Sequence, residues 1–199
     1  MIDHLAGILL SGGIDSICLT YLLKPKVAFT VNYGQNAAAA EIRAAKQLCD
    51  ELSIQHEIVN VDCSELGSGD LSSKQQLAYA PKSDWWPFRN QLLITLCSPK
   101  AIELGLTELI VGSVKSDGYH KDGTARFYQL INELLSFQEG GLEVAAPGLK
   151  WSTEELIIQS KIPKSLLYIA HSCHKSNIPC GQCRGCNKFH SVMTGLKDV

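Results

Sequence analysis

The chain has 199 residues, of which 45% are hydrophobic and 19% are charged, and its formal net charge is −2. This composition predicts a globular chain with a normal core and excludes a disordered one. The small net charge gives no nucleic-acid signal, so no nucleic-acid partner is expected. No apolar run reaches the ~18 residues of a membrane span, and the first residues lack the basic region of a signal peptide. We therefore expect a cytoplasmic protein without membrane contact.

Short apolar runs alternate with longer helix-like segments along most of the chain. Strands are expected at 5–10, 27–31, 54–61, 109–111 and 142–146. Helices are expected at 15–24, 37–52, 87–105, 122–138 and 152–161, with a helical turn at 163–170. Pro99 should kink or shorten the third helix. The polar segment 63–86 has little periodicity, which is typical of a functional lid or a mobile loop.

This order of elements predicts an α/β fold, a Rossmann-like parallel sheet with helices on both faces. We expect it to span residues 1–150, followed by a small C-terminal helical and cysteine-containing module at 151–199. Ligands of such sheets bind beyond the carboxyl ends of the strands. The polar segments 11–16, 32–36 and 112–117 each follow a predicted strand. They should therefore meet in one crevice.

The hexapeptide Ser11-Gly12-Gly13-Ile14-Asp15-Ser16 lies between a predicted strand and a predicted helix. A helix N-terminus has unpaired N–H groups and partial positive charge, so it attracts phosphate. Adjacent glycines let the main chain approach the anion, and the two serines add hydroxyl donors. The pattern is neither a Walker A loop nor a dinucleotide fingerprint. A serine–glycine turn without a ligand is the alternative, and phosphate binding is favoured.

Four cysteines near the end of the chain, Cys173, Cys180, Cys183 and Cys186, have spacing typical of a zinc site. A site with four thiolates has no open position, so its role should be structural. An iron–sulfur cluster and ordinary cysteines are the alternatives. Cys18, Cys49 and Cys97 fit helical core positions, whereas Cys63 follows a strand and is a weaker candidate for a catalytic thiol.

The pattern SGGxDS resembles the pyrophosphate loop of the ATP pyrophosphatases. Together with the cysteine tail, it resembles the 7-cyano-7-deazaguanine synthases (QueC-type enzymes). Further similar pieces are Asn32-Tyr33-Gly34-Gln35, Phe88-Arg89-Asn90, and His171-Ser172-Cys173 followed by Cys180-Gly181-Gln182-Cys183. The resemblance runs from residue 8 to residue 187.

The resemblance implies an ATP-dependent carbon–nitrogen ligase that is a homodimer and uses ATP, Mg²⁺ and Zn²⁺. The carboxylate of 7-carboxy-7-deazaguanine would be adenylated with release of pyrophosphate, and ammonia would displace AMP to give an amide. A second adenylation would drive dehydration to the nitrile.

The residues that match the family carry the expected roles. The expected catalytic residues are Ser11, Asp15, Ser16 and Arg89. ATP should contact Leu10, Ser11, Gly12, Gly13, Ile14, Asp15, Ser16 and Gly112. The substrate should contact Tyr33, Gln35, Phe88, Arg89, Asn90, Asp117, Tyr119 and Asp122, with Trp85 and Trp86 either stacking on the ring or packing in the core. Asp15 is expected to cap the helix or to hold Mg²⁺.

The sequence departs from the family in three places. The family's Gly-Tyr-Pro-Asp-Cys-Arg run is altered at 117–126, the family's Ser-Lys is Ser152-Thr153, and His174 replaces a tyrosine. Lys150 and Lys161 are candidates for the missing lysine. These departures suggest a variant that adenylates the deazaguanine carboxylate but transfers it to another nitrogen, such as a protein amine, like QueC-like proteins of antiphage defence systems.

Three other functions remain open from the sequence. The chain could be a tRNA-thiolating ATP pyrophosphatase, although it lacks an RNA-binding extension. It could be a non-catalytic, nucleotide-binding scaffold stapled by zinc. It could also be a zinc-ribbon nucleic-acid binder that uses Lys175, Arg184 and Lys188.

Overall fold

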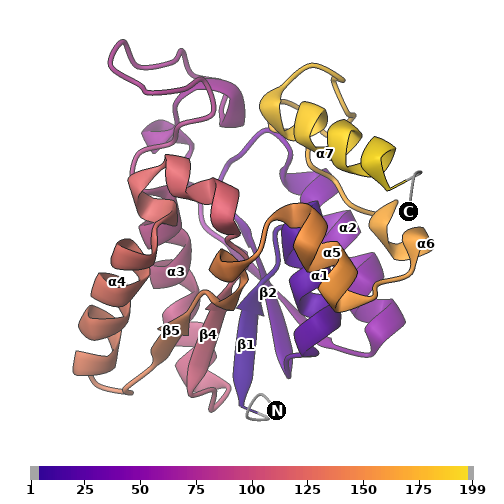
Figure 1. The fold of residues 1–199 in the computed structure, drawn as a ribbon. Helices are drawn as coiled ribbons and strands as arrows, with labels where there is room; N and C mark the ends of the chain where they lie inside the picture. The colour runs from indigo at the N-terminus through magenta and orange to yellow at the C-terminus, as the bar shows by residue number, and fades with distance from the viewer. Residues whose placement is uncertain (1–4, 197–199) are drawn as a thin grey trace.

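A five-stranded, fully parallel sheet forms the centre of the protein in the computed structural model, which describes residues 5–196. The strands are β1 (Ala6–Leu9), β2 (Val27–Asn32), β3 (Gln55–Asn60), β4 (Glu108–Val111) and β5 (Glu143–Ala145). Their order in the sheet is β3-β2-β1-β4-β5 (Figure 1). The expected parallel α/β fold is thereby confirmed.

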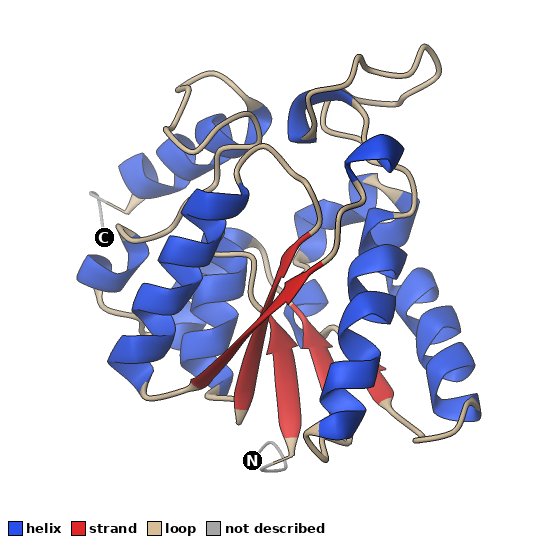
Figure 2. Cartoon of the chain, turned by 180° about the vertical axis from the view of Figure 1, so that it is seen from behind, coloured by secondary structure: helices blue, strands red, loops and turns tan. Residues whose placement is uncertain are grey.

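Seven α-helices connect and extend the strands. They are α1 (Ile14–Leu23), α2 (Ala38–Leu52), α3 (Arg89–Glu103), α4 (Ala125–Phe137), α5 (Thr153–Ser160), α6 (Lys164–Leu167) and α7 (Arg184–Gly195). Figures 1 and 2 show α1, α2 and α5 on one face of the sheet and α3 and α4 on the other. α7 lies near the carboxyl ends of the strands.

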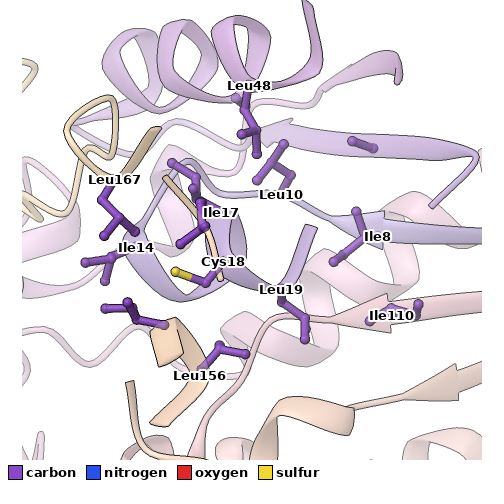
Figure 3. Close-up of a cluster of buried hydrophobic side chains, with 14 of the residues drawn as sticks. Ile8, Leu10, Ile14, Ile17, Cys18, Leu19, Leu48, Ile110, Leu156 and Leu167 are labelled. Carbon is purple, nitrogen blue, oxygen red and sulfur yellow. The ribbon is translucent and has the colours of Figure 1, made fainter. Parts of the chain in front are cut away.

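Side chains that alternate along the strands divide the core between the two faces of the sheet. Ile8 and Ile110 belong to the cluster under α1, whereas Leu109 and Val111 belong to the cluster under α3 and α4. Figure 3 shows the first cluster, in which α1 lies between residues of α2 and α5. Because both faces are covered, the inner strands β1, β2 and β4 can be apolar almost throughout.

The structure corrects two details of the predicted helices. α3 passes through Pro99 and ends at Glu103, so the proline does not shorten the helix, and a kink at Pro99 stays a prediction. Burial of Ile94, Cys97 and Ala101 on one side of α3 outweighs the one backbone donor that proline removes. The next helix begins at Ala125 rather than at 122, because the Thr124 side chain accepts a hydrogen bond from the Phe127 N–H and caps it there.

The segment 63–86 is anchored at several points rather than free of structure. It contains two short 3₁₀ helices, Ser64–Leu66 and Gly69–Leu71. The Asp70 N–H donates to the Ser83 carbonyl at 2.7 Å, and the Lys175 ammonium lies 3.2 Å from the Asp70 carboxylate. Its last residues include Trp86, which is 2% exposed and packs edge-on against Tyr33 in the core.

The residues after 150 pack on the same core as the sheet. Leu156, Leu167 and Val192 join the cluster that contains Ile14 and Ile17 of α1. The division of the chain at residue 150 remains a prediction. Among the described residues, no helix is both long and apolar enough to cross a membrane.

Ile17 holds the helix that follows the phosphate loop, and its side chain is completely buried. We predict that Ile17→Ala lowers the free energy of unfolding by about 2–5 kcal/mol, because the substitution leaves a cavity. Ile158→Ala on α5 is the matched control, since Ile158 is 57% exposed. Urea unfolding measures both. A loss of stability that is no larger for Ile17→Ala than for Ile158→Ala would contradict the packing described.

Candidate functional site

A cavity of about 520 Å³ opens beyond the carboxyl ends of the strands. It lies between the segments that follow β1 and β4, where the strand order reverses. Parallel sheets bind ligands at this switch point, because the two connections diverge to opposite faces of the sheet. Gly112 keeps the two segments close, since a Cβ there would lie 3.1 Å from the Ser16 Cα.

The loop between β1 and α1 has the geometry of an anion cradle. Gly12 has φ +76°, and a Cβ at this position would lie 2.6 Å from the Glu41 carbonyl oxygen, so only glycine fits. The Ser16 hydroxyl donates to the Gly13 carbonyl at 2.9 Å and lies 3.1 Å from the Ser11 hydroxyl. Gly13 is the N-cap and provides no side-chain cap for α1. The first N–H groups of this helix are therefore suited to an anion.

Asp15 connects this loop to the C-terminal part of the chain. The Thr153 hydroxyl donates to Asp15 Oδ1 at 2.6 Å, and the Lys188 ammonium donates to Oδ2 at 2.7 Å. Burial raises the pKa of the Asp15 carboxyl, against the opposing effect of Lys188. The Lys188 ammonium lies beside Asp15, and a role of Asp15 in holding Mg²⁺ stays a prediction.

Arg89 is the first residue of α3 and lies near acidic side chains and the hydroxyl of a tyrosine. Burial works against its charged form, but Tyr33, Asp122, Asp84 and Glu41 together raise the pKa of Arg89 above its ordinary value. Burial also raises the pKa of Glu41 to about 7. The guanidinium is thus permanently charged, and it lines the cavity.

A cluster of ionisable groups forms another part of the cavity lining around Asp84, which is 8% exposed. Asp84 Oδ2 lies 3.2 Å from Arg184 and 3.6 Å from His174, and Oδ1 lies 3.7 Å from His120. Asp84 Oδ1 is buried and has no hydrogen-bond partner among the described residues. An acceptor of this kind suits a ligand that carries N–H groups.

Most of the expected site residues line this one cavity. They are Leu10, Ser11, Gly13, Ile14, Asp15, Ser16, Tyr33, Arg89, Asn90, Gly112, Asp117 and Asp122. Asn90 is fixed by Asp122, whose carbonyl accepts from Asn90 Nδ2 at 2.7 Å. Gly12 shapes the loop instead of lining the cavity, and its carbonyl accepts the His171 N–H at 2.8 Å.

Three of the expected substrate contacts, Gln35, Phe88 and Tyr119, do not line this cavity. Gln35 is buried and bonded to Glu41 and to the Val31 carbonyl. Phe88 is 76% exposed, and it precedes α3 in the left-handed conformation (φ +57°). The ring of Tyr119 is 55% exposed and lies against the Arg184 guanidinium.

Several lining residues were not expected from the sequence to belong to the site. They include Glu41, Asp84, His120, Thr153, Arg184 and Lys188. Arg184 and Lys188 are four positions apart on α7, so they share one face of the helix. The four-residue spacing of these two cations was the feature of the sequence from which a shared position could have been predicted. Cys63 does not line the cavity and packs in the core, which weakens its candidacy as a catalytic thiol.

The four cysteine sulfur atoms of the tail all lie within 4.8 Å of one another. Cys180 and Cys186 are 4.0 Å apart, and Cys173 and Cys183 are 3.9 Å apart. A tetrahedral ion with Zn–S bonds of about 2.3 Å separates its sulfurs by roughly 3.8 Å. An iron–sulfur cubane binds its cysteines through different iron atoms and holds them farther apart. The geometry therefore fits a single ion.

We predict that Gly12→Ala weakens ATP binding at least about tenfold, because the new Cβ would collide with the Glu41 carbonyl and displace the loop. Gly105→Ala is the matched control. Gly105 also has positive φ (+70°), but nothing lies within 4 Å of its Cβ position. Calorimetric titration with ATP measures both variants. Equal affinities would show that the loop does not form the ATP site.

We predict about one zinc ion per chain, measured by elemental analysis of the purified protein. Cys183→Ser should lose the ion and lower the thermal midpoint, because Cys183 belongs to the cluster and bound metal contributes folding free energy. Cys63→Ser should keep the ion, since Cys63 lies outside the cluster. Iron with acid-labile sulfide in the intact protein would instead identify a cluster.

Solved structures with the same architecture support the fold. The U34-tRNA thiolase NcsA from Methanococcus maripaludis, solved with its [4Fe-4S] cluster, superposes with a TM-score of 0.55 at 20% identity. The match covers 97% of this chain and 66% of NcsA. NMN synthetase from Francisella tularensis has a TM-score of 0.53 at 18% identity, over 99% of this chain and 78% of that one. At these identities the likeness concerns the fold alone.

Relatives by sequence match nearly the whole chain. The 7-cyano-7-deazaguanine synthase of Methanocaldococcus jannaschii is 28% identical, over 95% of this chain and 95% of its own length. That of Desulforudis audaxviator is also 28% identical, over 92% and 93%. The family model described as "Queuosine biosynthesis protein QueC" matches residues 6–194. Together with the phosphate loop and the cysteine tail, this match shows that the chain belongs to the QueC family.

Proposed function

We propose that this protein is an ATP-dependent ligase that converts 7-carboxy-7-deazaguanine to the 7-nitrile with ammonia as the nitrogen source. The substrate carboxylate attacks the α-phosphate of ATP, and pyrophosphate leaves. Ammonia then displaces AMP to give the amide. A second adenylation, now of the amide oxygen, allows loss of AMP and a proton to form the nitrile. The relatives named above are synthases of this nitrile, and they match over almost their whole length.

The observation that carries the proposal is that one cavity joins the anion cradle to Arg89. Adenylation requires a triphosphate and a carboxylate to meet in line, and holding both reactants removes most of the entropic cost of the encounter. Ser11, Ser16 and the first N–H groups of α1 are suited to the phosphates. Arg89 is suited to the carboxylate, which it can bind in bidentate fashion.

The other groups around the cavity are suited to a deazaguanine ring. Tyr33 offers an aromatic surface, and the buried Oδ1 of Asp84 offers an acceptor to ring N–H groups. Although the family's Asp-Cys-Arg run is absent, Asp117 and Asp122 still place carboxylates on the lining. These contacts give no separate support to a protein amine as the nucleophile or to a scaffold without turnover.

Two metals accompany the proposed reaction. Mg²⁺ would enter with ATP and offset the charge of its phosphates. Zn²⁺ is the ion we propose for Cys173, Cys180, Cys183 and Cys186, and it would fix the start of α7. The predicted homodimer remains an expectation from the resemblance.

We predict that the protein, given ATP, Mg²⁺, 7-carboxy-7-deazaguanine and ammonia, forms AMP, pyrophosphate and the nitrile. Mass spectrometry of the products measures this. Arg89→Met should lower turnover about 100-fold or more, because the carboxylate loses its charged partner. Arg126→Met is the control, since Arg126 is exposed on α4 and bonded to Gln129. Absence of AMP would refute the proposal, and accumulation of the amide alone would refute its final step.

A further inference from the structure

The side chain of Lys188 reaches from α7 into the cavity beside the phosphate loop. Its Nζ donates to Asp15 Oδ2 at 2.7 Å and lies 3.9 Å from Asp117 Oδ1. The side chain is 31% exposed, so the ammonium is accessible from the cavity that it lines. It is therefore in a position to meet a ligand bound at the loop.

Lys188 places a positive charge beside the loop between β1 and α1, which has no positively charged side chain. Residues 5–23, from β1 to the end of α1, include no lysine or arginine. The two arginines that line the cavity lie beside other groups, because Arg184 pairs with Asp84 and Arg89, the proposed partner of the carboxylate, lies among Tyr33, Glu41 and Asp122. A triphosphate has several negative charges and needs a cation near its α- and β-phosphates.

The backbone around Lys188 is held from two directions. Toward the N-terminus of α7, Cys183 caps the helix and Cys186 belongs to the four-cysteine cluster. Toward its C-terminus, Val192 is buried against the core cluster that also contains Ile14 and Ile17. The flexible lysine stem therefore extends from a fixed backbone, and the ammonium can move from Asp15 to a nearby phosphate oxygen without any shift of the helix.

We propose that Lys188 is a catalytic residue that contacts the phosphates of ATP, and this rests on the proposed function. The bond between the α-phosphorus and its bridging oxygen breaks while the carboxylate oxygen bonds to the α-phosphorus. The electron pair leaves with pyrophosphate. Lys188 keeps its proton and stabilises the charge that accumulates on the phosphate oxygens. Asp15 holds the ammonium in place until ATP arrives.

The test compares Lys188→Met and Lys188→Arg with Lys150→Met and Lys161→Met. Lys150 and Lys161 do not line the cavity, and they are the lysines that the sequence alone made candidates for this role. Pyrophosphate release with ATP and the 7-carboxylate should fall at least about 100-fold in kcat for Lys188→Met. It should fall less for Lys188→Arg and stay unchanged for the other two, with the zinc content the same in all four.

A second measurement separates contact with ATP from mere neutralisation of Asp15. The probe is an ATP analogue with a methylene bridge between the α- and β-phosphorus atoms, titrated calorimetrically. Lys188→Met should weaken its binding about tenfold in the wild-type background and again in an Asp15→Asn background. The double variant leaves no unpaired carboxylate at residue 15, so its fold does not depend on the ion pair.

The outcomes distinguish the two proposals. If the wild-type protein binds the analogue but forms no pyrophosphate, the proposed function fails, and Lys188 is still judged by the binding cycle. If Lys188→Met keeps kcat within about threefold of the wild type, or does not weaken binding when Asp15 is asparagine, the role assigned to Lys188 is overturned. If the wild-type protein does not bind the ATP analogue, both proposals are overturned.

Discussion

The Asp15 carboxylate is the central contact of the site, because it joins the first helix, α1, to α5 and α7. One oxygen accepts from Thr153 at the start of α5, and the other accepts from Lys188 on α7. Beside it, the His171 N–H donates to the carbonyl of Gly12. The C-terminal residues that make these contacts also pack on the core through Leu156, Leu167 and Val192, and they cover one side of the phosphate loop. The phosphate loop follows strand β1 of the sheet, and residues between 152 and 188 form the rest of this side of the cavity.

Opposite charges balance one another around the cavity before any ligand is bound. Arg89 lies near Glu41 and Asp122, and Arg184 and Asp84 form a pair. Burial raises the pKa of Glu41 to about 7, so this carboxyl readily accepts a proton near neutral pH. A site of this kind can receive an anion without the full cost of burying unpaired cations, because each cation already has a partner that it can exchange.

The sequence predicted those features that depend on neighbouring residues. The strands, the glycine loop and the cysteine cluster all follow from local pattern and spacing, and the structure places them as expected. Features that depend on distant contacts were missed. Lys188 meets Asp15 across 173 positions, and no local pattern indicates that pairing. Phe88 resembled a substrate contact, but it is 76% exposed and does not line the cavity.

Because these contacts join residues far apart in the sequence, most of the sheet is synthesised long before the site can be completed. Strands β1 to β4 are complete once residue 111 has been made, so the centre of the sheet can assemble during synthesis. The partners of Asp15 lie 138 and 173 positions farther along. In a nascent chain, the four strands β1 to β4 therefore exist before the residues that complete the pocket. Translation that stops before α7 would give a product that folds its centre yet lacks a complete nucleotide site.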